Sequence, residues 1–301
     1  MQHSNLSILA ALAALTLANA ALVAEEMAMN SAAPPNTVTQ SEKAAGWRLL
    51  WDGKTTDGWR SAGPGPFPAK KWDIADGVLT VHAANNALAV GGGNIITRER
   101  FANFELCADF KVTPGANSGI KYFVQSTVDQ DNHTGGDRGV GCEFQILDDD
   151  LNPDAKLGRD GNRKLGSLYD LLPPAANKRV NPVGEWNTAR ILVEGKHVEH
   201  WLNGQKVLEY ERGSPGFLAC VAQSKFHNIP DFGEWPDGHI LLQEHGDRVH
   251  FRNLKIRPFA PIANKSATTG ATGTNWSATF TSVATSNLDS TSPSLHLPAA
   301  R

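Results

Sequence analysis

Short runs of alternating apolar and polar residues, separated by turn-forming residues, fill positions 46–259 of this chain. In the run 101–112, the residues Phe104, Leu106, Ala108 and Phe110 share one parity, and mostly polar or charged residues share the other. A period of two is typical of β-strands that bury one face. No helical period persists long enough to predict a core helix. Many short strands with turns between them predict a sandwich, jelly roll or closed barrel.

Turn residues indicate how neighbouring strands pair. Asn203-Gly204 separates VEHWL from QKVLEYE and is a strong signal for a type I′ hairpin. A second hairpin is expected in 72–82 with its turn near Asp76-Gly77, and the last two strands are expected around Gly246-Asp247. In a compact domain, long irregular segments usually serve function. Such segments are predicted at 127–138, 149–167, 172–185 and 213–237.

The two ends of the chain differ from this strand-rich region. Residues 6–24 form an apolar Ala- and Leu-rich run with small-residue cleavage sites, which predicts a signal peptide over 1–24 and a linker over 25–45. An uncleaved anchor is the alternative, because the run is nearly long enough to span a bilayer. Residues 260–301 are rich in Ser and Thr and predict a disordered tail. We therefore expect an exported protein, periplasmic or extracellular, with one β-domain over 46–259.

Charge and cysteine content exclude some classes of partner and site. The net charge is −3 and the charged residues are scattered, so no basic face for nucleic acid is expected. The three cysteines, Cys107, Cys142 and Cys220, allow one disulfide or none. Their spacing fits no zinc pattern. Free thiols buried in a sandwich core are the expected arrangement.

The stretch GVGCEFQILDDD (139–150) places a carboxylate in the middle of a predicted strand. Because side chains alternate across a strand, Glu143 and Gln145 share one face, and Phe144 and Ile146 point to the core. Amides and charges on one sheet face suit a sugar-binding groove. A face that is merely solvated is the alternative, since antiparallel sheets commonly leave one face in water.

Two further strands are expected to contribute to the same polar face. In 117–125 the core set is expected to be Ile120, Tyr122 and Val124, and the opposite set Asn117, Lys121, Phe123 and Gln125. In 239–245 the two sets are Ile240, Leu242 and Glu244 against His239, Leu241, Gln243 and His245.

At these residues the chain resembles the 3-keto-disaccharide hydrolase domain family. The resemblance runs in family order over nearly all of 46–259, and the tails lie outside it. It implies a concanavalin- or laminarinase-like β-jelly roll of two curved antiparallel sheets, with the ligand on the concave face. The matching stretches are GWRLLWDGKTTDGWR (46–60), WDIADGVLTV (72–81), FANFELCADFKVTPGANSGIKYF (101–123), GCEFQILDDD (141–150), GSLYDLLPP (166–174), GEWNTARILVEGKHVEHWLNG (184–204) and GHILLQEHGDRVHFRNLKIR (238–257).

The resemblance also implies action on glycosides whose C3 hydroxyl has been oxidised to a ketone. Family members often carry Arg in the strand after Asn-Ser-Gly-Ile, where this chain has Lys121 or Tyr122. Lysine lacks the bidentate fork of arginine, so the contact with a sugar oxygen is weaker at this position.

Ordinary glycosidases use two carboxylates at a set separation. Laminarinase-type enzymes carry them on one strand at two-residue steps, but here Glu143 is followed by Gln145 and Leu147. Cleavage of a 3-keto sugar does not need a second carboxylate, because the ketone acidifies the hydrogen on C2. A base removes that proton, the leaving group departs from C1, and water then adds to the enone. This route requires one base, one acid and donors that stabilise the enolate.

We assign Glu143 as base and His245 as acid, with the reverse assignment left open. His245 at a hairpin end in water is the alternative for that residue. For Asp148 the alternatives are a loop cap or a cation ligand. No cofactor is required, although Glu143 and His245 are suitable ligands for a divalent metal. The predicted substrate-binding residues are Asn117, Lys121, Gln145, Asp148, Tyr169 and Gln243.

Three functions from different classes fit these residues. Cleavage of a small 3-keto-glycoside ranks first. A non-catalytic carbohydrate-binding module ranks second, because the same groove binds sugar without chemistry. A surface adhesion sandwich, with the Ser- and Thr-rich tail as a stalk, ranks third.

Overall fold

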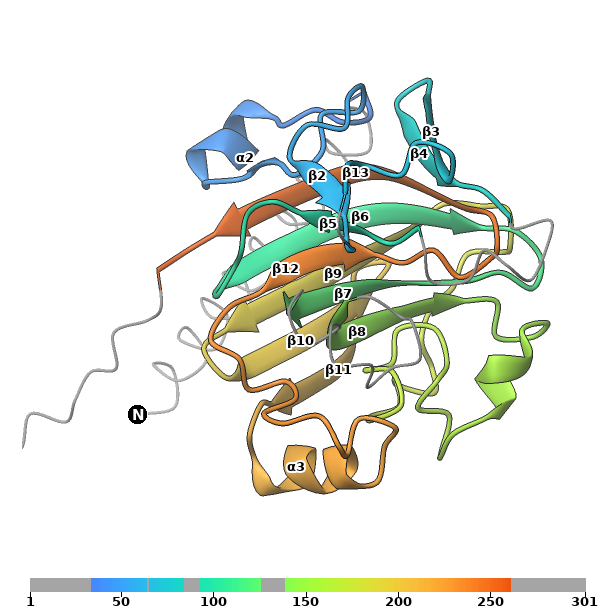
Figure 1. Cartoon of the computed structure of the whole chain (residues 1–301), viewed down its shortest axis with the longest axis vertical. Helices are drawn as coiled ribbons and strands as arrows, with labels where there is room; N and C mark the ends of the chain where they lie inside the picture. The colour runs from blue at the N-terminus through green and yellow to red at the C-terminus, as the bar shows by residue number, and fades with distance from the viewer. Residues whose placement is uncertain (1–33, 64, 84–92, 126–138, 261–301) are drawn as a thin grey trace, which may run out of the picture. The chain divides into compact units, whose positions relative to one another are not determined.

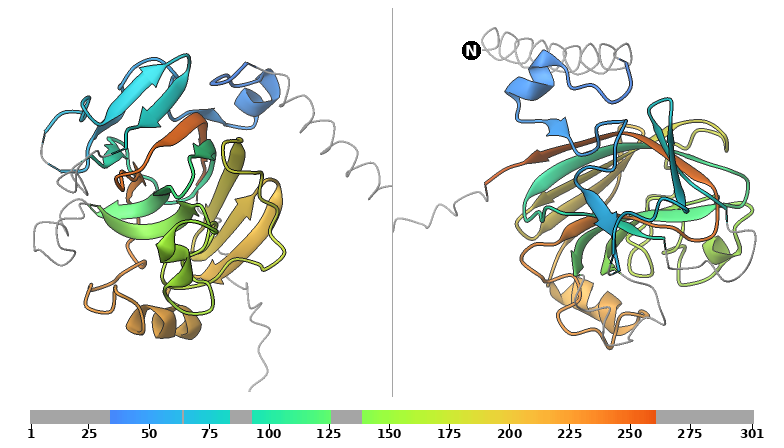
Figure 2. Two further views of the ribbon diagram at one scale, coloured as in Figure 1. Left: turned by 90° about the vertical axis from the view of Figure 1, so that its right-hand side faces the viewer. Right: turned by 45° about the horizontal axis from the view of Figure 1, so that its top comes forward.

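The computed structural model describes residues 34–63, 65–83, 93–125 and 139–260. The predicted signal peptide, the segment 127–138 and the tail from 261 onward lie outside the described residues. The described chain is a sandwich of two antiparallel β-sheets, which confirms the predicted jelly-roll class. The smaller sheet faces the larger sheet, and α2 and α3 lie at opposite ends of the sandwich (Figures 1 and 2).

The larger sheet has the strand order β11-β10-β9-β6-β13-β4-β3, with β1 paired to β13. Its strands are β1 (Arg48–Leu49), β3 (Trp72–Ala75), β4 (Val78–Val81), β6 (Phe104–Val112), β9 (Asn187–Glu194), β10 (His197–Leu202), β11 (Gln205–Glu211) and β13 (Val249–Pro258). The smaller sheet has the order β2-β5-β12-β7-β8. Its strands are β2 (Trp59–Ser61), β5 (Ile95–Thr97), β7 (Asn117–Gln125), β8 (Val140–Leu147) and β12 (His239–Leu242).

The two predicted tight hairpins are confirmed. β3 pairs with β4 and β10 with β11, each in antiparallel register. The turn residues have positive φ angles, 52° and 72° at Asp76-Gly77 and 49° and 76° at Asn203-Gly204. Asn, Asp and Gly tolerate this left-handed backbone, as a type I′ turn requires.

Helical segments are short. They are α2 (Gln40–Ala44), the 3₁₀ turn η2 (Pro153–Lys156) and α3 (Pro215–Ala222). α3 corrects the prediction that 213–237 is irregular throughout. Ser214 caps it by accepting a hydrogen bond from the backbone of Phe217, and the Phe217 ring stacks on Tyr210 at 5.6 Å. Eight residues with Pro and Gly at the start are too few to show a helical period.

The core lies between the sheets and follows the predicted alternation of β6. Phe104, Leu106, Ala108 and Phe110 are all buried within it. The cysteine prediction is only partly confirmed. All three thiols are free, but only Cys142 is in the core, whereas Cys107 and Cys220 are partly exposed.

A polar chain crosses this core. The Tyr122 hydroxyl lies 2.8 Å from Nε2 of His200 and 2.7 Å from the Tyr210 hydroxyl. Nδ1 of His200 lies 3.1 Å from the carbonyl oxygen of Gly166 and therefore donates to it. Nε2 is then the acceptor for Tyr122, and the Tyr122 oxygen accepts from Tyr210. The buried polar groups are thus paired in one series, from Tyr210 in β11 through Tyr122 in β7 to His200 in β10.

A bulge in β7 overturns part of the face assignment. Pairing with β8 shifts between Tyr122 and Gln125, and Phe123 has a φ of 55°. Tyr122 and Phe123 consequently both pack in the core, with ring centroids 5.8 Å apart. Val124 instead joins Leu241 on the other face of the sheet. The predictions for Phe123 and Val124 were wrong because a bulge adds one residue and reverses the parity beyond it.

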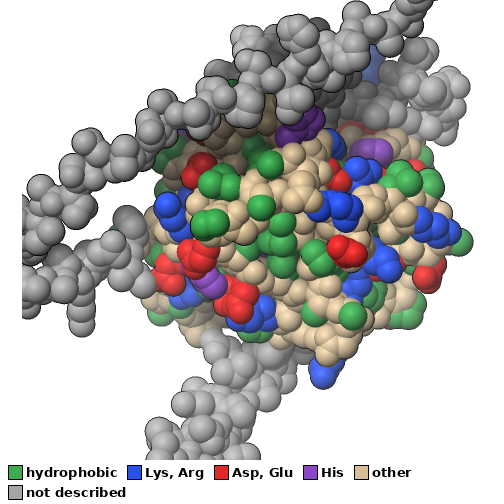
Figure 3. Space-filling model, turned by 90° about the horizontal axis from the view of Figure 1, so that it is seen from below, with side chains coloured by type: hydrophobic (Ala, Val, Ile, Leu, Met, Phe, Trp, Pro, Cys, Tyr) green, Lys and Arg blue, Asp and Glu red, His purple; other side chains and the backbone are tan. Residues whose placement is uncertain are grey.

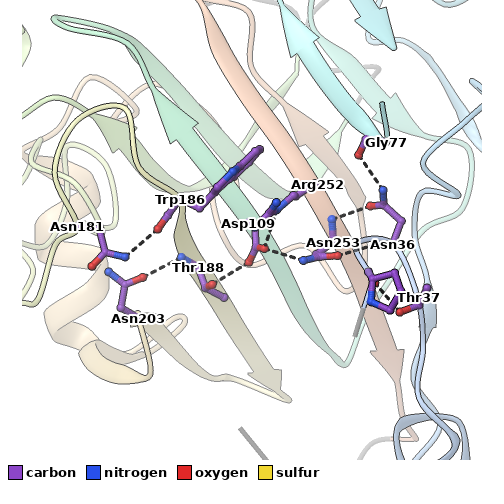
Figure 4. Close-up of polar contacts among 11 residues, drawn as sticks. Asn36, Thr37, Gly77, Asp109, Asn181, Trp186, Thr188, Asn203, Arg252 and Asn253 are labelled. Carbon is purple, nitrogen blue, oxygen red and sulfur yellow. Dashed lines mark hydrogen bonds and ion pairs between the residues drawn. The ribbon is translucent and has the colours of Figure 1, made fainter. Parts of the chain in front are cut away.

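Residues 34–45, assigned to the linker from the sequence, contact the larger sheet (Figure 4). Asn36 and Asn253 exchange two hydrogen bonds, from Asn36 N to Oδ1 of Asn253 at 2.6 Å and from Asn253 N to Oδ1 of Asn36 at 2.8 Å. Nδ2 of Asn36 donates to the carbonyl oxygen of Gly77 at 2.7 Å. Further along, Nζ of Lys255 lies 2.7 Å from Glu42 in α2.

We expect Asn36→Ala to lower the free energy of unfolding by about 2–3 kcal/mol, since it removes two side-chain bonds and loosens a third. Thermal unfolding of the full chain measures this, with an expected fall of roughly 5–10 °C in Tm. Thr37→Ala is the matched control, because its hydroxyl bonds only to the carbonyl oxygen of Pro34. Equal Tm values for the two variants would show that Asn36 does not anchor the segment.

Surface charge agrees with the sequence. On the face seen from below, acidic and basic side chains are interspersed with apolar ones (Figure 3). Within the described ranges, no helix has both the length and the apolar character to cross a membrane.

Candidate functional site

The strand register of the smaller sheet aligns one residue from each strand in a single row. Reading from β2 to β8, the row is Arg60, Ile96, Leu241, Lys121 and Glu143. The alternate residues Ile120, Phe144 and Leu242 belong to the core between the sheets. We call the face that carries this row, which is turned away from the larger sheet, the site face.

The site face has an apolar half and a polar half. Ala62, Ile96, Val124 and Leu241 form a separate apolar cluster over β2, β5, β12 and the end of β7. The polar half lies over β7 and β8 and contains Lys121, Glu143 and Gln145, all at least 95% buried. This placement confirms the predicted faces of Lys121, Glu143 and Gln145. Of the two alternatives to the family's arginine, Lys121 is on the site face and Tyr122 is in the core.

The carboxylate of Glu143 lies between two donors. Nζ of Lys121 is 3.8 Å from Oε2, with side chains only 6% and 4% exposed. The Gln145 amide, oriented with Nε2 toward acceptors, donates to Oε1 of Glu143 at 3.1 Å and to the carbonyl oxygen of Ser118 at 3.0 Å. The backbone N–H of Tyr169 donates to the carbonyl oxygen of Glu143 at 3.1 Å, which fixes the strand beside it.

Tyr169 borders this carboxylate from the loop after β8. Two cationic side chains lie over its ring: Nζ of Lys225 is 4.5 Å and Cζ of Arg163 is 5.4 Å from the ring centroid. Burial, followed by the charges of Glu143 and Asp154, raises the pKa of the Tyr169 phenol well above its ordinary value. Tyr169 therefore keeps its proton at neutral pH, its hydroxyl bonds to Asp154, and the charge of Glu143 acts on it from nearby.

Gln243 and Asn117 also lie at the polar half. The backbone N–H of Gln243 donates to the carbonyl oxygen of Gly119 at 3.0 Å, which continues the pairing of β12 with β7. Oε1 of Gln243 is buried and has no hydrogen-bond partner among the residues that the structure describes. Asn117 is buried, and its backbone N–H donates to Oδ2 of Asp247 at 2.9 Å.

Asp148 was predicted to bind substrate, but its carboxylate is bonded to backbone N–H groups. Its carboxylate accepts from the backbone N–H groups of Gly115 at 2.9 Å, Asp150 at 3.0 Å and Leu151 at 3.2 Å. Burial alone would raise the pKa of Asp148, but these three bonds outweigh it and lower the pKa. The residue caps the loop after β8, which was the alternative considered from the sequence, and we leave it out of the proposed site.

His245 lies two residues beyond Gln243, where the regular strand β12 has ended. Its side chain is exposed. It makes no hydrogen bond or ion pair with any residue in the described ranges. The structure thus brings together Glu143, Lys121, Gln145 and Tyr169, and leaves His245 at the margin with access to solvent.

The described residues contain a cluster with metal-ligand geometry on the larger sheet. His197, Glu199 and Glu209 offer ligand atoms within 4.8 Å of one another. Nζ of Lys206 lies 3.2 Å from Glu199 and 2.5 Å from Glu209, so one ammonium group pairs with both carboxylates. At Glu143 the Lys121 ammonium lies 3.8 Å from the carboxylate.

Sequence reasoning did not single out Gly119, which lies directly beside the Glu143 carboxylate. A Cβ atom at position 119 would lie 2.1 Å from Oε1 of Glu143. The available signal was the glycine inside a predicted strand interior, which often marks a close approach of another group.

Comparison with known proteins finds relatives over most of the β-domain. The model of the 3-keto-alpha-glucoside-1,2-lyase-like domain matches residues 46–257. A 3-keto-disaccharide hydrolase of Bacteroides thetaiotaomicron is 37% identical over 235 residues, covering 71% of this chain and 79% of that protein. A crystal structure from Parabacteroides distasonis, provisionally described as a glycosyl hydrolase, is 31% identical with a TM-score of 0.65, covering 75% of this chain and 100% of that one. A second such structure from this organism is 28% identical with a TM-score of 0.51, covering 71% and 99%.

Proposed function

This chain belongs to the 3-keto-alpha-glucoside-1,2-lyase-like domain family, and from that premise we propose that it cleaves 3-keto-glycosides by elimination followed by hydration. The ligand class is a small carbohydrate whose C3 carries a ketone. The observation that supports this chemistry best is a single buried carboxylate, Glu143, held between the Lys121 ammonium and the Gln145 amide.

Three other carboxylates near β8 are engaged elsewhere. Asp148 accepts three backbone N–H groups. Asp154 and Asp170 both pair with Arg163, at 2.9 Å and 2.7 Å. A mechanism with two carboxylates on opposite sides of the glycosidic bond has no second acid on β8, where Gln145 and Leu147 follow Glu143. A mechanism with one base is therefore favoured.

In the proposed first step, Glu143 takes the proton from C2, and the C2–H electron pair forms the enolate with the C3 ketone. Lys121 and the neutral Tyr169 phenol supply positive charge and a donor near the developing oxyanion, while the Gln145 amide holds Glu143. The C1–O bond then breaks, and the leaving group takes a proton from the acid, assigned to His245. Water next adds its oxygen to C1 and a proton returns to C2, so the net reaction is hydrolysis.

Three further proposals complete this function. The apolar run 6–24 exports the chain, which then acts in the periplasm or outside the cell. The reaction requires no metal in this proposal, since the Lys121 ammonium supplies positive charge beside Glu143, and a divalent metal bound by Glu143 and His245 is the alternative. Residues Asn117 and Gln243 hold sugar hydroxyl groups, and Oε1 of Gln243, which has no partner among the described residues, accepts from one of them.

We expect residues 25–301 to cleave 3-keto-trehalose and 3-keto-glucosides and to leave the unoxidised parent sugars intact. The products are followed with and without a chelator. Equal rates in the two conditions agree with the metal-free reaction, whereas loss on chelation contradicts it. Sugar binding without cleavage of any keto substrate would replace the enzyme with a carbohydrate-binding module.

The acid is identified by two variants in the same assay. His245→Gln is expected to slow cleavage of substrates with a poor leaving group more than those with a nitrophenolate leaving group, which needs no proton. Tyr169→Phe is expected to slow both kinds of substrate equally, because its donor acts on the enolate. The opposite pattern would assign the acid role to Tyr169.

A further inference from the structure

We infer that Gly119 is a positioning residue, kept without a side chain so that the Glu143 carboxylate can lie across β7. This inference rests on the proposed function, in which Glu143 is the base. Its physical basis is the space above the Cα atom of Gly119, which the Glu143 carboxylate occupies. The position of that carboxylate can be tested without measuring turnover.

The geometry leaves no room for a larger residue at position 119. A Cβ atom there would lie 2.1 Å from Oε1, 2.8 Å from Cδ and 3.0 Å from Cγ of Glu143. Contacts below 3.0 Å require one group to move. The nearest atoms belong to the end of a flexible side chain, not to the backbone, so the carboxylate is the group that moves.

The backbone does not explain this glycine. Gly119 lies inside β7 and is absent from the residues with positive φ, so an alanine can adopt its conformation. A glycine in a strand interior costs stability relative to residues with side chains. The chain therefore retains an unfavourable residue at a place where only the Glu143 carboxylate benefits from it.

The position that Gly119 permits is the one in which both donors reach the carboxylate. Gly119 is paired with Gln145 across β7 and β8, and Lys121 is paired with Glu143 in the next row. The carboxylate leans from its own row toward Gly119, where Oε1 meets the Gln145 amide at 3.1 Å while Oε2 stays 3.8 Å from Nζ of Lys121. A methyl group at position 119 displaces Oε1 from the Gln145 amide.

The test is Gly119→Ala in the chain lacking residues 1–24. We expect kcat for a 3-keto-glucoside to fall about 100-fold, as a misplacement of about 1 Å can cause. We expect KM to change less than threefold and Tm to stay within a few degrees. Gly216→Ala in α3 is the matched control, because a Cβ atom there meets nothing within 4 Å. Wild-type kcat in Gly119→Ala would overturn the inference.

A double-mutant cycle separates positioning from general damage. Glu143→Asp shortens the side chain by one methylene and withdraws the carboxylate from position 119. If the methyl group acts on the carboxylate, Gly119→Ala added to Glu143→Asp costs less than threefold in kcat. A 100-fold loss in both backgrounds would mean that position 119 acts through something other than Glu143, and would also overturn the inference.

A spectroscopic measurement keeps this result separate from the fate of the proposed function. The side-chain amide resonance of Gln145 reports its hydrogen bond to Oε1 of Glu143. We expect this resonance to shift in Gly119→Ala and to remain unchanged in Gly216→Ala. An inactive wild type with the expected shift would refute the proposed function and retain the positioning. An active wild type whose Gln145 resonance is unaffected by Gly119→Ala would do the reverse.

Discussion

Glu143→Gln is expected to lower kcat for 3-keto-glycosides by about 10²–10⁴-fold, the usual contribution of a positioned general base. Glutamine has nearly the shape of glutamate and still fits over Gly119, so sugar binding is expected to change little. A matched loss of kcat and kcat/KM measures a group that acts only in the transition state. A rise in KM at constant kcat would contradict the base and indicate a binding role.

The same substitution has a cost in stability, because it removes the carboxylate that lies 3.8 Å from the buried Lys121 ammonium. Removing one partner of a buried ion pair destabilises by about 3–5 kcal/mol, and the 3.8 Å separation here places the expected value at the lower end. Lys121→Met together with Glu143→Gln removes both charges and should recover most of that stability without recovering activity. Chemical denaturation of the single and double variants tests this.

A control variant is available on the opposite sheet. Glu105 is also buried, and it pairs with both Arg190 and Arg257 on the outer face of the larger sheet. Glu105→Gln is expected to reduce stability while leaving kcat within about twofold, since local losses away from the site rarely reach the transition state. A similar fall in kcat for the two glutamine variants would mean that general destabilisation, not loss of a base, explains the effect.

The sequence predicted the sheet faces of β6 and β8 correctly because each strand keeps an unbroken period of two. The same reasoning failed beyond Tyr122, since nothing in Phe123-Val124 shows that Phe123 adopts a φ of 55°. It also missed the contact of Asn36 with Asn253, which are 217 positions apart. Pairing between distant segments is set by packing of the whole sandwich, not by a local pattern.

The candidate site was predictable to a similar extent. Alternation is sufficient to place Glu143, Gln145 and Lys121 together, but it does not reveal that Gly119 makes room for the carboxylate. Alternation also does not predict the surroundings of Asp148 and His245. Both are residue types that catalysis uses, yet one carboxylate is taken by three backbone N–H groups and the imidazole is exposed. Such differences depend on loop conformation after a strand ends, where periodicity gives no information.

A loss of stability at mildly acidic pH is expected from His200, and His200→Gln should remove it. The imidazole is fully buried in the polar chain with Tyr122 and Tyr210. Burial lowers the pKa of His200 to about 4, and the bonds to the backbone of Gly166 and Ser167 only partly offset this effect. In the unfolded chain the ordinary histidine pKa of about 6.5 applies.

The sign follows from these two pKa values. Between pH 6.5 and pH 4 the unfolded chain binds a proton at position 200 that the folded chain does not, so the free energy of unfolding falls as the pH falls. The decrease is about 1.4 kcal/mol per pH unit and about 3 kcal/mol over the whole window. Above pH 6.5 the imidazole is neutral in both states and its contribution is constant.

Urea unfolding at several pH values measures this slope as a difference between variants, because carboxylates titrate in the same window and cancel. The wild type should lose about 3 kcal/mol more than His200→Gln between pH 6.5 and pH 4, whatever packing cost the substitution has at pH 7. His227→Gln is the control, since this side chain is exposed in the loop after α3. Parallel profiles for the wild type and His200→Gln would mean that the folded protein accepts a proton on His200 and would contradict this prediction. In the structure Nδ1 of His200 is bonded to Gly166 and Nε2 to Tyr122, so a second ring proton would break the hydrogen bond to Tyr122.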